Sequence, residues 1–212
     1  MNIFRLLGDM LHLASILILL LKITQTNSCS GISLKSQVLY LAVFGTRYLN
    51  LFWYYGSLYL VVMRLFFIAS SAYVVYLMQY KLKPTYNKGD DLFRAEYLAV
   101  GAAILALLFH EKFEVYEIIW TFSIYLEAVA IFPQLFMLTR KGEAENITTH
   151  YLFALGAYRG LYIINWIYRY NTENIFHPYT VIAGIVQTAL YADFFYIYVT
   201  KVMYGQKFRL PV

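Results

Sequence analysis

The sequence predicts an all-α membrane protein with seven transmembrane helices. Hydrophobic residues make up 61% of the chain and charged residues 14%, whereas a soluble domain is about half apolar and about a quarter charged. Crossing about 30 Å of hydrocarbon takes about 20 helical residues, and seven windows have that length and composition. They are 3–22, 37–55, 58–80, 94–110, 115–138, 149–169 and 178–201.

The charges of the connections predict which way the helices run. Lys112 is the only Lys or Arg in the connections after the second, fourth and sixth spans. Positive connections stay in the cytosol, so we expect a lumenal N-terminus, a cytosolic C-terminus and an unglycosylated Asn146 sequon. The other connections, the span ends beside them and the C-terminal tail hold eleven cations: Lys22, Lys35, Lys81, Lys83, Lys88, Arg94, Arg140, Lys141, Lys201, Lys207 and Arg209.

Taken in order, the spans form one predicted domain, 1–212, with a short cytosolic tail, 202–212. The first span lacks a basic leader and a small-residue cleavage site, so we expect a retained helix. Pro133 interrupts the fifth span and predicts a break there, because proline cannot donate a backbone hydrogen bond. The single cysteine, Cys29, excludes an internal disulfide.

Four arginines inside the predicted spans are candidates for ligand binding: Arg5, Arg47, Arg159 and Arg169. A charge at the bilayer centre costs roughly 2.5–3.5 kcal/mol, so such residues usually face a cavity or a partner. An arginine near a helix end can instead extend to the headgroups, an alternative that fits Arg169 better than the central Arg159. Several cations in one small membrane protein indicate a ligand with several negative charges.

Polar residues of four spans fall on single helical faces, which predicts a polar cavity open to the lumen. Arginine binds carboxylates with two hydrogen bonds, and an acid beside a tryptophan suits a cation, so the cavity fits an elongated acidic ligand with one cationic end. Arg64 either has a structural role, such as pairing with a buried acid, or belongs to the ligand site, and the structural role is favoured. The faces comprise Arg5, Asp9 and His12; Arg47, Asn50 and Tyr54; Glu117, Trp120, Ile124 and Glu127; and Tyr158, Tyr162, Asn165 and Arg169, flanked by Arg159 and Trp166.

Nothing in the sequence predicts catalysis, a metal site or a cofactor. No HExxH, CxxC, GxSxG or P-loop pattern is present, and the two acids of the fifth span, ten residues apart, are too distant to share a proton. Histidine titrates near pH 6.5, so His12 is either a pH switch or a neutral hydrogen-bonding group.

Ordered blocks along the whole chain resemble the KDEL receptor family, the ER lumen protein-retaining receptors. The resemblance implies a fold similar to the PQ-loop (SWEET) sugar transporters, with two three-helix bundles joined by the fourth helix. The blocks are Met1 to Arg5, Thr46 to Leu49, Trp120 to Glu127, Pro133-Gln134, Thr148 to Tyr151, Tyr158-Arg159, Asn165-Trp166, Arg169-Tyr170, Asp193 to Tyr196 and Thr200 to Val202, with the ending Leu210-Pro211.

The resemblance also implies a function. Such receptors lie in the endoplasmic reticulum, the intermediate compartment and the cis-Golgi. They bind the C-terminal Lys/His-Asp-Glu-Leu signal of escaped lumenal proteins at acidic pH, return it in retrograde coatomer vesicles and release it at neutral pH. This ligand has three carboxylates and a cationic first residue, as the predicted cavity requires.

By the same resemblance, each residue has an expected role. Glu117 and Trp120 would read the first residue of the signal, and His12 would sense pH together with Tyr158 and Glu127. Asp193 would serve the transport cycle. The signal's carboxylates would be held by Arg5, Arg47, Tyr48, Arg159 and Arg169, and the predicted site also includes Asn50, Tyr54, Tyr162, Asn165 and Trp166.

Two departures from the family pattern affect these expectations. Asn50 replaces the usual aspartate, so we expect better tolerance of a neutral or histidine first residue than of lysine. Tyr204 and Gln206 replace tail lysines, which leaves Lys201 and Lys207 as candidates for coatomer recognition.

Two other functions remain open at this level. A PQ-loop-type small-solute transporter also has charges inside the membrane. Its site would lie near the midplane of the bilayer, whereas these arginines cluster towards the lumenal side. A structural membrane adaptor would use the same charges only for internal pairing.

Overall fold

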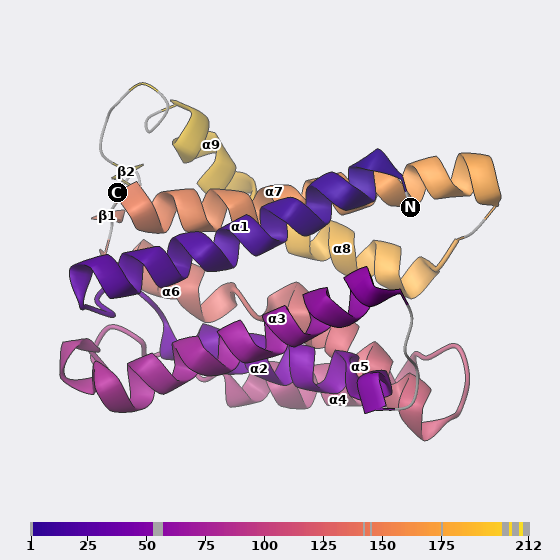
Figure 1. The fold of residues 1–212 in the computed structure, drawn as a ribbon, viewed down its shortest axis with the longest axis horizontal. Coiled ribbons are helices and arrows are strands. Elements are labelled where there is room, and N and C mark those ends of the chain that lie inside the picture. The colour runs from indigo at the N-terminus through magenta and orange to yellow at the C-terminus, as the bar shows by residue number, and fades with distance from the viewer. Residues whose placement is uncertain are drawn as a thin grey trace. The chain divides into compact units, whose positions relative to one another are not determined.

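The computed structural model describes residues 2–52, 57–141, 143–144, 146–174, 176–200, 204 and 208–209, and these are mostly helical (Figure 1). The helices are α1 (Ile3–Thr26), α2 (Leu34–Arg47), α3 (Leu58–Tyr76), α4 (Glu96–Leu108), α5 (Val115–Val129), α6 (Phe132–Lys141), α7 (Asn146–Glu173), α8 (Pro178–Leu190) and α9 (Ala192–Thr200). Shorter elements are the 3-10 turns η1 (Leu49–Phe52) and η3 (Lys83–Thr85), the π-helical turn η2 (Leu77–Lys81) and the antiparallel strands β1 (Glu143–Ala144) and β2 (Phe208–Arg209).

Within the described residues, three helical stretches are long and apolar enough to cross a membrane: Ile3–Thr26, Leu58–Lys81 and Val115–Lys141. Pro178–Leu190 and Phe194–Thr200, bent by 48°, make a fourth if they count as one span. Among the described residues, each predicted span overlaps a helix, but α2 has only 14 residues and ends at Arg47. The structure thus supports a helical membrane protein, and seven crossings stay a prediction.

The chain divides into two compact units, residues 1–31 with 138–212, and residues 32–137. The first helix therefore groups with α7, α8 and α9. The resemblance instead implies two three-helix bundles joined by the fourth helix, and that arrangement stays a prediction.

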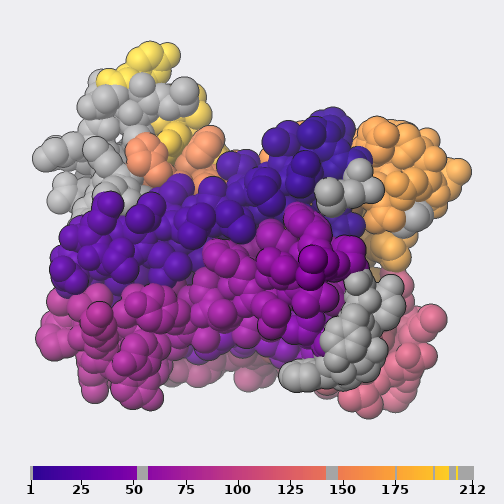
Figure 2. Space-filling model, in the orientation of Figure 1, coloured from indigo at the N-terminus to yellow at the C-terminus, as the bar shows by residue number. Residues whose placement is uncertain are grey.

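In the first unit, α1 is capped at both ends. The Asn2 side chain accepts a hydrogen bond from the Arg5 backbone N–H at 2.9 Å, and Asn27 ends the helix with a left-handed φ of 47°. Such caps satisfy backbone groups that a helix end leaves unpaired. The surface of α1 is continuous in Figure 2 (indigo), and the exposed apolar side chains of α1 follow helical spacing: Ile3, Leu7, Met10, Leu17 and Leu21.

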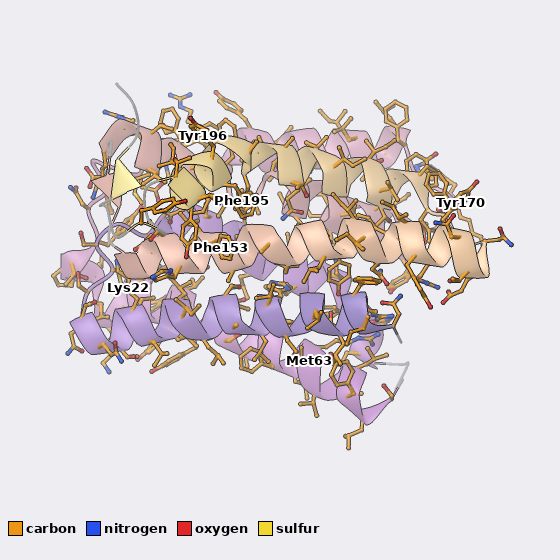
Figure 3. The ribbon with its side chains drawn as sticks, turned by 90° about the horizontal axis from the view of Figure 1, so that it is seen from above. Lys22, Met63, Phe153, Tyr170, Phe195 and Tyr196 are labelled. Carbon is orange, nitrogen blue, oxygen red and sulfur yellow. The ribbon has the colours of Figure 1, made fainter. Side chains whose placement is uncertain are left out.

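Helix α7 lies between α1 and the pair α8 and α9 (Figure 3). Two glycines permit this close packing. A Cβ on Gly8 of α1 would lie 2.9 Å from the Tyr162 ring, and one on Gly184 of α8 would lie 2.3 Å from the Trp166 ring. Both glycines thereby leave room for aromatic side chains of the α7 polar face.

In the second unit, α2 packs on α3 and α5, and α4 packs on α5. Aromatic rings fill the α2–α3 contact, with the Phe44 and Phe67 centroids 5.4 Å apart. Stacked pairs of this kind stabilise a helix contact beyond their burial alone.

The break predicted at Pro133 is confirmed, because α5 ends at Val129 and α6 begins at Phe132. Gln134 joins this break to the start of α2. Its backbone N–H donates to the Ser36 hydroxyl at 3.0 Å, and its side-chain oxygen accepts from the Ser33 N–H at 2.8 Å. The two-way bond fixes the orientation of α6 against α2 in this unit.

The connection from η3 to α4 is anchored by Asp91, which is 2% exposed. Its carboxylate accepts hydrogen bonds from the Ser33 hydroxyl at 2.9 Å, the Lys35 N–H at 3.2 Å and the Tyr86 hydroxyl at 2.8 Å. Burial, the hydrogen bond to Asp91 and the charge of Asp91 all raise the pKa of the Tyr86 phenol. The acid is thus turned inward and fully used in holding the loop.

Candidate functional site

The predicted α7 polar face lies against α1 in the first unit. The Asn2 amide donates to the Asn165 side-chain oxygen at 2.7 Å, and the Tyr162 hydroxyl donates to the Asp9 carboxylate. Tyr162 and Asn165 therefore both face α1, as their spacing predicts. This first polar cluster follows the contact between α1 and α7, which lie side by side in Figure 3.

The most deeply placed part of this cluster is a stack of His12 on Tyr158. Their ring centroids are 4.1 Å apart and their planes differ by 3°, and both side chains are buried. Tyr158 therefore contacts both His12 and Arg159. The sequence-based link between His12 and Tyr158 has a direct geometric basis.

Arg159 does not extend to the headgroups, because it is only 7% exposed. Its Nε donates to the Tyr158 hydroxyl at 3.1 Å, and its guanidinium lies 5.1 Å from the Tyr158 centroid and 5.9 Å from that of Tyr162. A desolvated cation over an aromatic face is stabilised by up to about 2 kcal/mol. The two tyrosines thus stabilise this buried cation.

The other two predicted ligand-binding arginines of the first unit, Arg5 and Arg169, are more accessible. Arg5 is half-buried in the first turns of α1. Arg169 donates through Nε to Glu173 one turn later at 2.7 Å, and the two side chains are 32% and 44% exposed. An exposed pair of this type contributes little to stability, so an incoming carboxylate can replace Glu173 at low cost.

The second unit holds a second polar cluster around Arg47, the last residue of α2. Nη1 pairs with Glu127, Nε donates to the Ser123 hydroxyl at 3.1 Å, and Nη2 donates to the Ser123 carbonyl at 2.9 Å. Glu127 is 2% exposed, so its carboxylate depends on this arginine for compensation. Arg47 and Glu127 were assigned separate roles from sequence, and the structure joins them.

Arg64 of α3 has a different partner from the acid that the sequence suggested. Its Nη1 donates to the Asn50 side-chain oxygen at 3.2 Å, and its guanidinium lies 5.9 Å from the Tyr48 ring centroid. Asn50 and Tyr48, both predicted to contact a ligand, are therefore linked through this cation.

Glu117 and Trp120 occupy the first turns of α5, where both are half-buried. An acid in the first turn is favoured by the helix dipole. The Trp120 carbonyl accepts a hydrogen bond from the Ser123 hydroxyl at 2.6 Å, which links this turn to the Arg47 contacts.

Some predicted residues cannot be placed. Tyr54, Lys201 and Lys207 lie outside the described residues, as does the side chain of Asp193. Three contributors were missed. Asn2 has a signal, an asparagine before an apolar helical run, and Glu173 is four residues from Arg169, a spacing that pairs side chains on a helix. Nothing in the sequence marks Ser123.

The apolar helices and their buried, arginine-containing polar clusters define a multi-helix membrane protein. Residues 28–169 match the family model described as ER lumen protein retaining receptor. Receptors named for ER lumen protein retention share 56% identity with the chain in Drosophila melanogaster, 59% in Caenorhabditis elegans (erd-2.2) and 58% in Gallus gallus (receptor 2), each over 100% of both chains.

The chain belongs to the ER lumen protein-retaining receptor family, and the resemblance stated from sequence is confirmed. The family is one of retention receptors and not of enzymes. Among the described residues, no group of three or more His, Cys, Asp or Glu side chains is arranged to hold a metal ion.

The Arg47–Glu127 pair generates a stability prediction. Arg47→Met leaves a buried carboxylate without its cation, so we expect the free energy of unfolding to fall by about 3 kcal/mol. Arg47→Met combined with Glu127→Leu removes both charges and should recover most of that loss. Thermal unfolding of the purified variants in detergent measures both effects, and additive losses in the double variant would contradict the pairing.

Proposed function

We propose that this chain is a receptor in membranes of the endoplasmic reticulum, the intermediate compartment and the cis-Golgi that retrieves escaped lumenal proteins. It binds their C-terminal Lys/His-Asp-Glu-Leu-type signal at acidic pH and releases it at neutral pH. The observation that carries the proposal is the buried Arg159, held against a tyrosine that stacks on His12. Family membership supports the retention role.

The charges of the first unit suit the signal's carboxylates. Arg5, Arg159 and Arg169 differ in depth, from the 7% exposed Arg159 to the 32% exposed side chain of Arg169. A short peptide with two side-chain carboxylates and a terminal carboxylate can use cations at several depths. Guanidinium groups bind such groups through paired hydrogen bonds.

By the family resemblance, Glu117 and Trp120 are the proposed contacts to the cationic first residue. Glu117 provides negative charge and Trp120 an aromatic face. Asn50 adds no charge, and its side-chain oxygen already accepts from Arg64. The balance of charge at this position favours a first residue that is neutral or histidine.

Protonation of His12 is the proposed switch. His12 stacks on Tyr158 of α7, whose hydroxyl accepts a hydrogen bond from Arg159, and Asp9 lies one turn earlier on α1. A second positive charge beside Arg159 raises the local potential and favours an acidic ligand at Golgi pH. A tenfold change in affinity needs only about 1.4 kcal/mol of differential interaction.

Retrieval requires a cytosolic signal and a membrane arrangement. We propose seven transmembrane helices in one receptor domain, 1–212, of the PQ-loop type, with the N-terminus lumenal and the C-terminus cytosolic. Ligand-bound closure presents the tail, with Lys201 and Lys207, to coatomer, and Asp193 contributes to that transition. The β1–β2 pairing keeps Phe208–Arg209 beside Glu143–Ala144 in the first unit.

Binding of a Lys-Asp-Glu-Leu peptide measured from about pH 5.5 to about pH 7.5 tests the switch. We expect wild-type affinity to fall at least tenfold as pH rises and His12→Ala to bind with little pH dependence. His110→Ala, a histidine change outside both polar clusters, should keep the wild-type profile. Unchanged pH dependence in His12→Ala excludes the sensor role, and solute uptake without saturable peptide binding would favour a transporter.

Peptides that differ only in the first residue test Asn50. Wild type should bind peptides beginning with alanine or histidine at least as well as one beginning with lysine. Asn50→Asp restores a negative charge and should improve lysine binding roughly fivefold relative to alanine. A strong preference of the wild type for lysine at the first residue would contradict this hypothesis.

A further inference from the structure

Three exposed tyrosines that the receptor site does not use lie in a row from the end of α3 into η2. Tyr73 and Tyr76 stack with centroids 6.4 Å apart, and Tyr76 and Tyr80 stack at 5.7 Å. They are 46%, 51% and 71% exposed, so exposure increases towards the end of the helix. The row lies on Leu58–Lys81, one of the stretches long enough to cross a membrane. Tyrosine is enriched where hydrocarbon meets headgroups.

A compact basic loop follows directly. Its lysines, Lys81, Lys83 and Lys88, are all exposed. The loop is folded, because the Leu82 N–H donates to the Leu77 carbonyl at 2.7 Å and the Tyr86 N–H to the Lys83 carbonyl at 3.2 Å. These bonds hold the lysine-bearing backbone in a fixed path at the end of the helix.

The buried acid of this loop does not cancel the exposed positive charge. Asp91 points inward and accepts hydrogen bonds from Ser33 and Tyr86. Of the two acids in the loop, Asp91 is buried and Asp90 is half-buried, whereas the three lysines are exposed. Figure 2 shows the end of α3 and the loop after it as part of the visible surface (magenta).

We propose that this tyrosine–lysine surface, comprising Tyr73, Tyr76, Tyr80, Lys81, Lys83 and Lys88, binds an anionic phospholipid whose headgroup carries a phosphate monoester. The lysines bind the phosphates, and the stacked rings contact the glycerol and the upper acyl chains. Continuity between an exposed helix face and the basic loop favours a membrane lipid over a soluble partner. The inference is independent of the proposed peptide site.

Titration of the purified full-length chain with dioctanoyl phosphatidylinositol 4-phosphate tests this surface. Each lysine near an anionic headgroup contributes roughly fivefold in affinity, so Lys81→Gln/Lys83→Gln/Lys88→Gln should bind about a hundredfold more weakly. The charge-matched control Lys112→Gln/Arg140→Gln/Lys141→Gln should bind as wild type does. An unchanged melting temperature verifies that each variant is folded.

A second comparison separates lipid from free headgroup. Wild type should bind the lipid more tightly than inositol 1,4-bisphosphate, and Tyr76→Ala/Tyr80→Ala should abolish that difference while leaving headgroup binding intact. Equal losses of lipid affinity in the Lys81→Gln/Lys83→Gln/Lys88→Gln loop variant and in the charge-matched control would show only general charge attraction. That result would contradict a specific lipid site. Wild-type lipid binding by Lys81→Gln/Lys83→Gln/Lys88→Gln would also overturn the proposal. That result would be expected if the surface bound a protein partner and not a lipid.

Discussion

Burial of a guanidinium inside an apolar helix pair is the constraint on which the proposed receptor depends. Two solutions occur in one chain. Arg47 is paired with a buried carboxylate, which neutralises its charge, whereas Arg159 contacts the rings and a hydroxyl of two tyrosines. Ring faces and hydroxyls stabilise a cation and leave its charge in place. The first arrangement is an ion pair inside the protein, and in the proposed receptor the second cation binds a carboxylate of the signal.

The Tyr162 ring, which Arg159 contacts, packs closely against α1. Gly8 leaves room for the Tyr162 ring, and Gly184 does the same for Trp166 on the α8 side. Because the His12–Tyr158 stack spans the same α1–α7 contact, protonation of His12 acts on a packed interface and not on an isolated side chain. In the proposed switch, protonation of His12 therefore changes both the local charge and the packing of two helices. This coupling gives the proposed switch a route from one histidine to a rearrangement of the whole unit.

Much of the helical pattern could be predicted from the sequence, because apolar length and proline position act locally. The break near Pro133 and the common face of Tyr162 and Asn165 are examples. Periodicity shows which face a residue occupies but not which helix lies opposite, so the Arg47–Glu127 pair was not foreseen. The grouping of α1 with α7 is likewise a tertiary result. The residue roles came from the family resemblance, since spacing alone cannot distinguish a ligand cavity from internal pairing.

The most direct test of the central claim is calorimetric titration of purified receptor with a Lys-Asp-Glu-Leu peptide at about pH 5.5, comparing wild type with Arg159→Lys. Lysine keeps the positive charge but loses the planar, two-pronged hydrogen bonding and much of the stacking on tyrosine. If Arg159 binds a carboxylate of the signal, affinity should fall about a hundredfold, or about 2.7 kcal/mol, in a variant that still melts near the wild-type temperature. Wild-type affinity in a folded Arg159→Lys receptor would contradict the account.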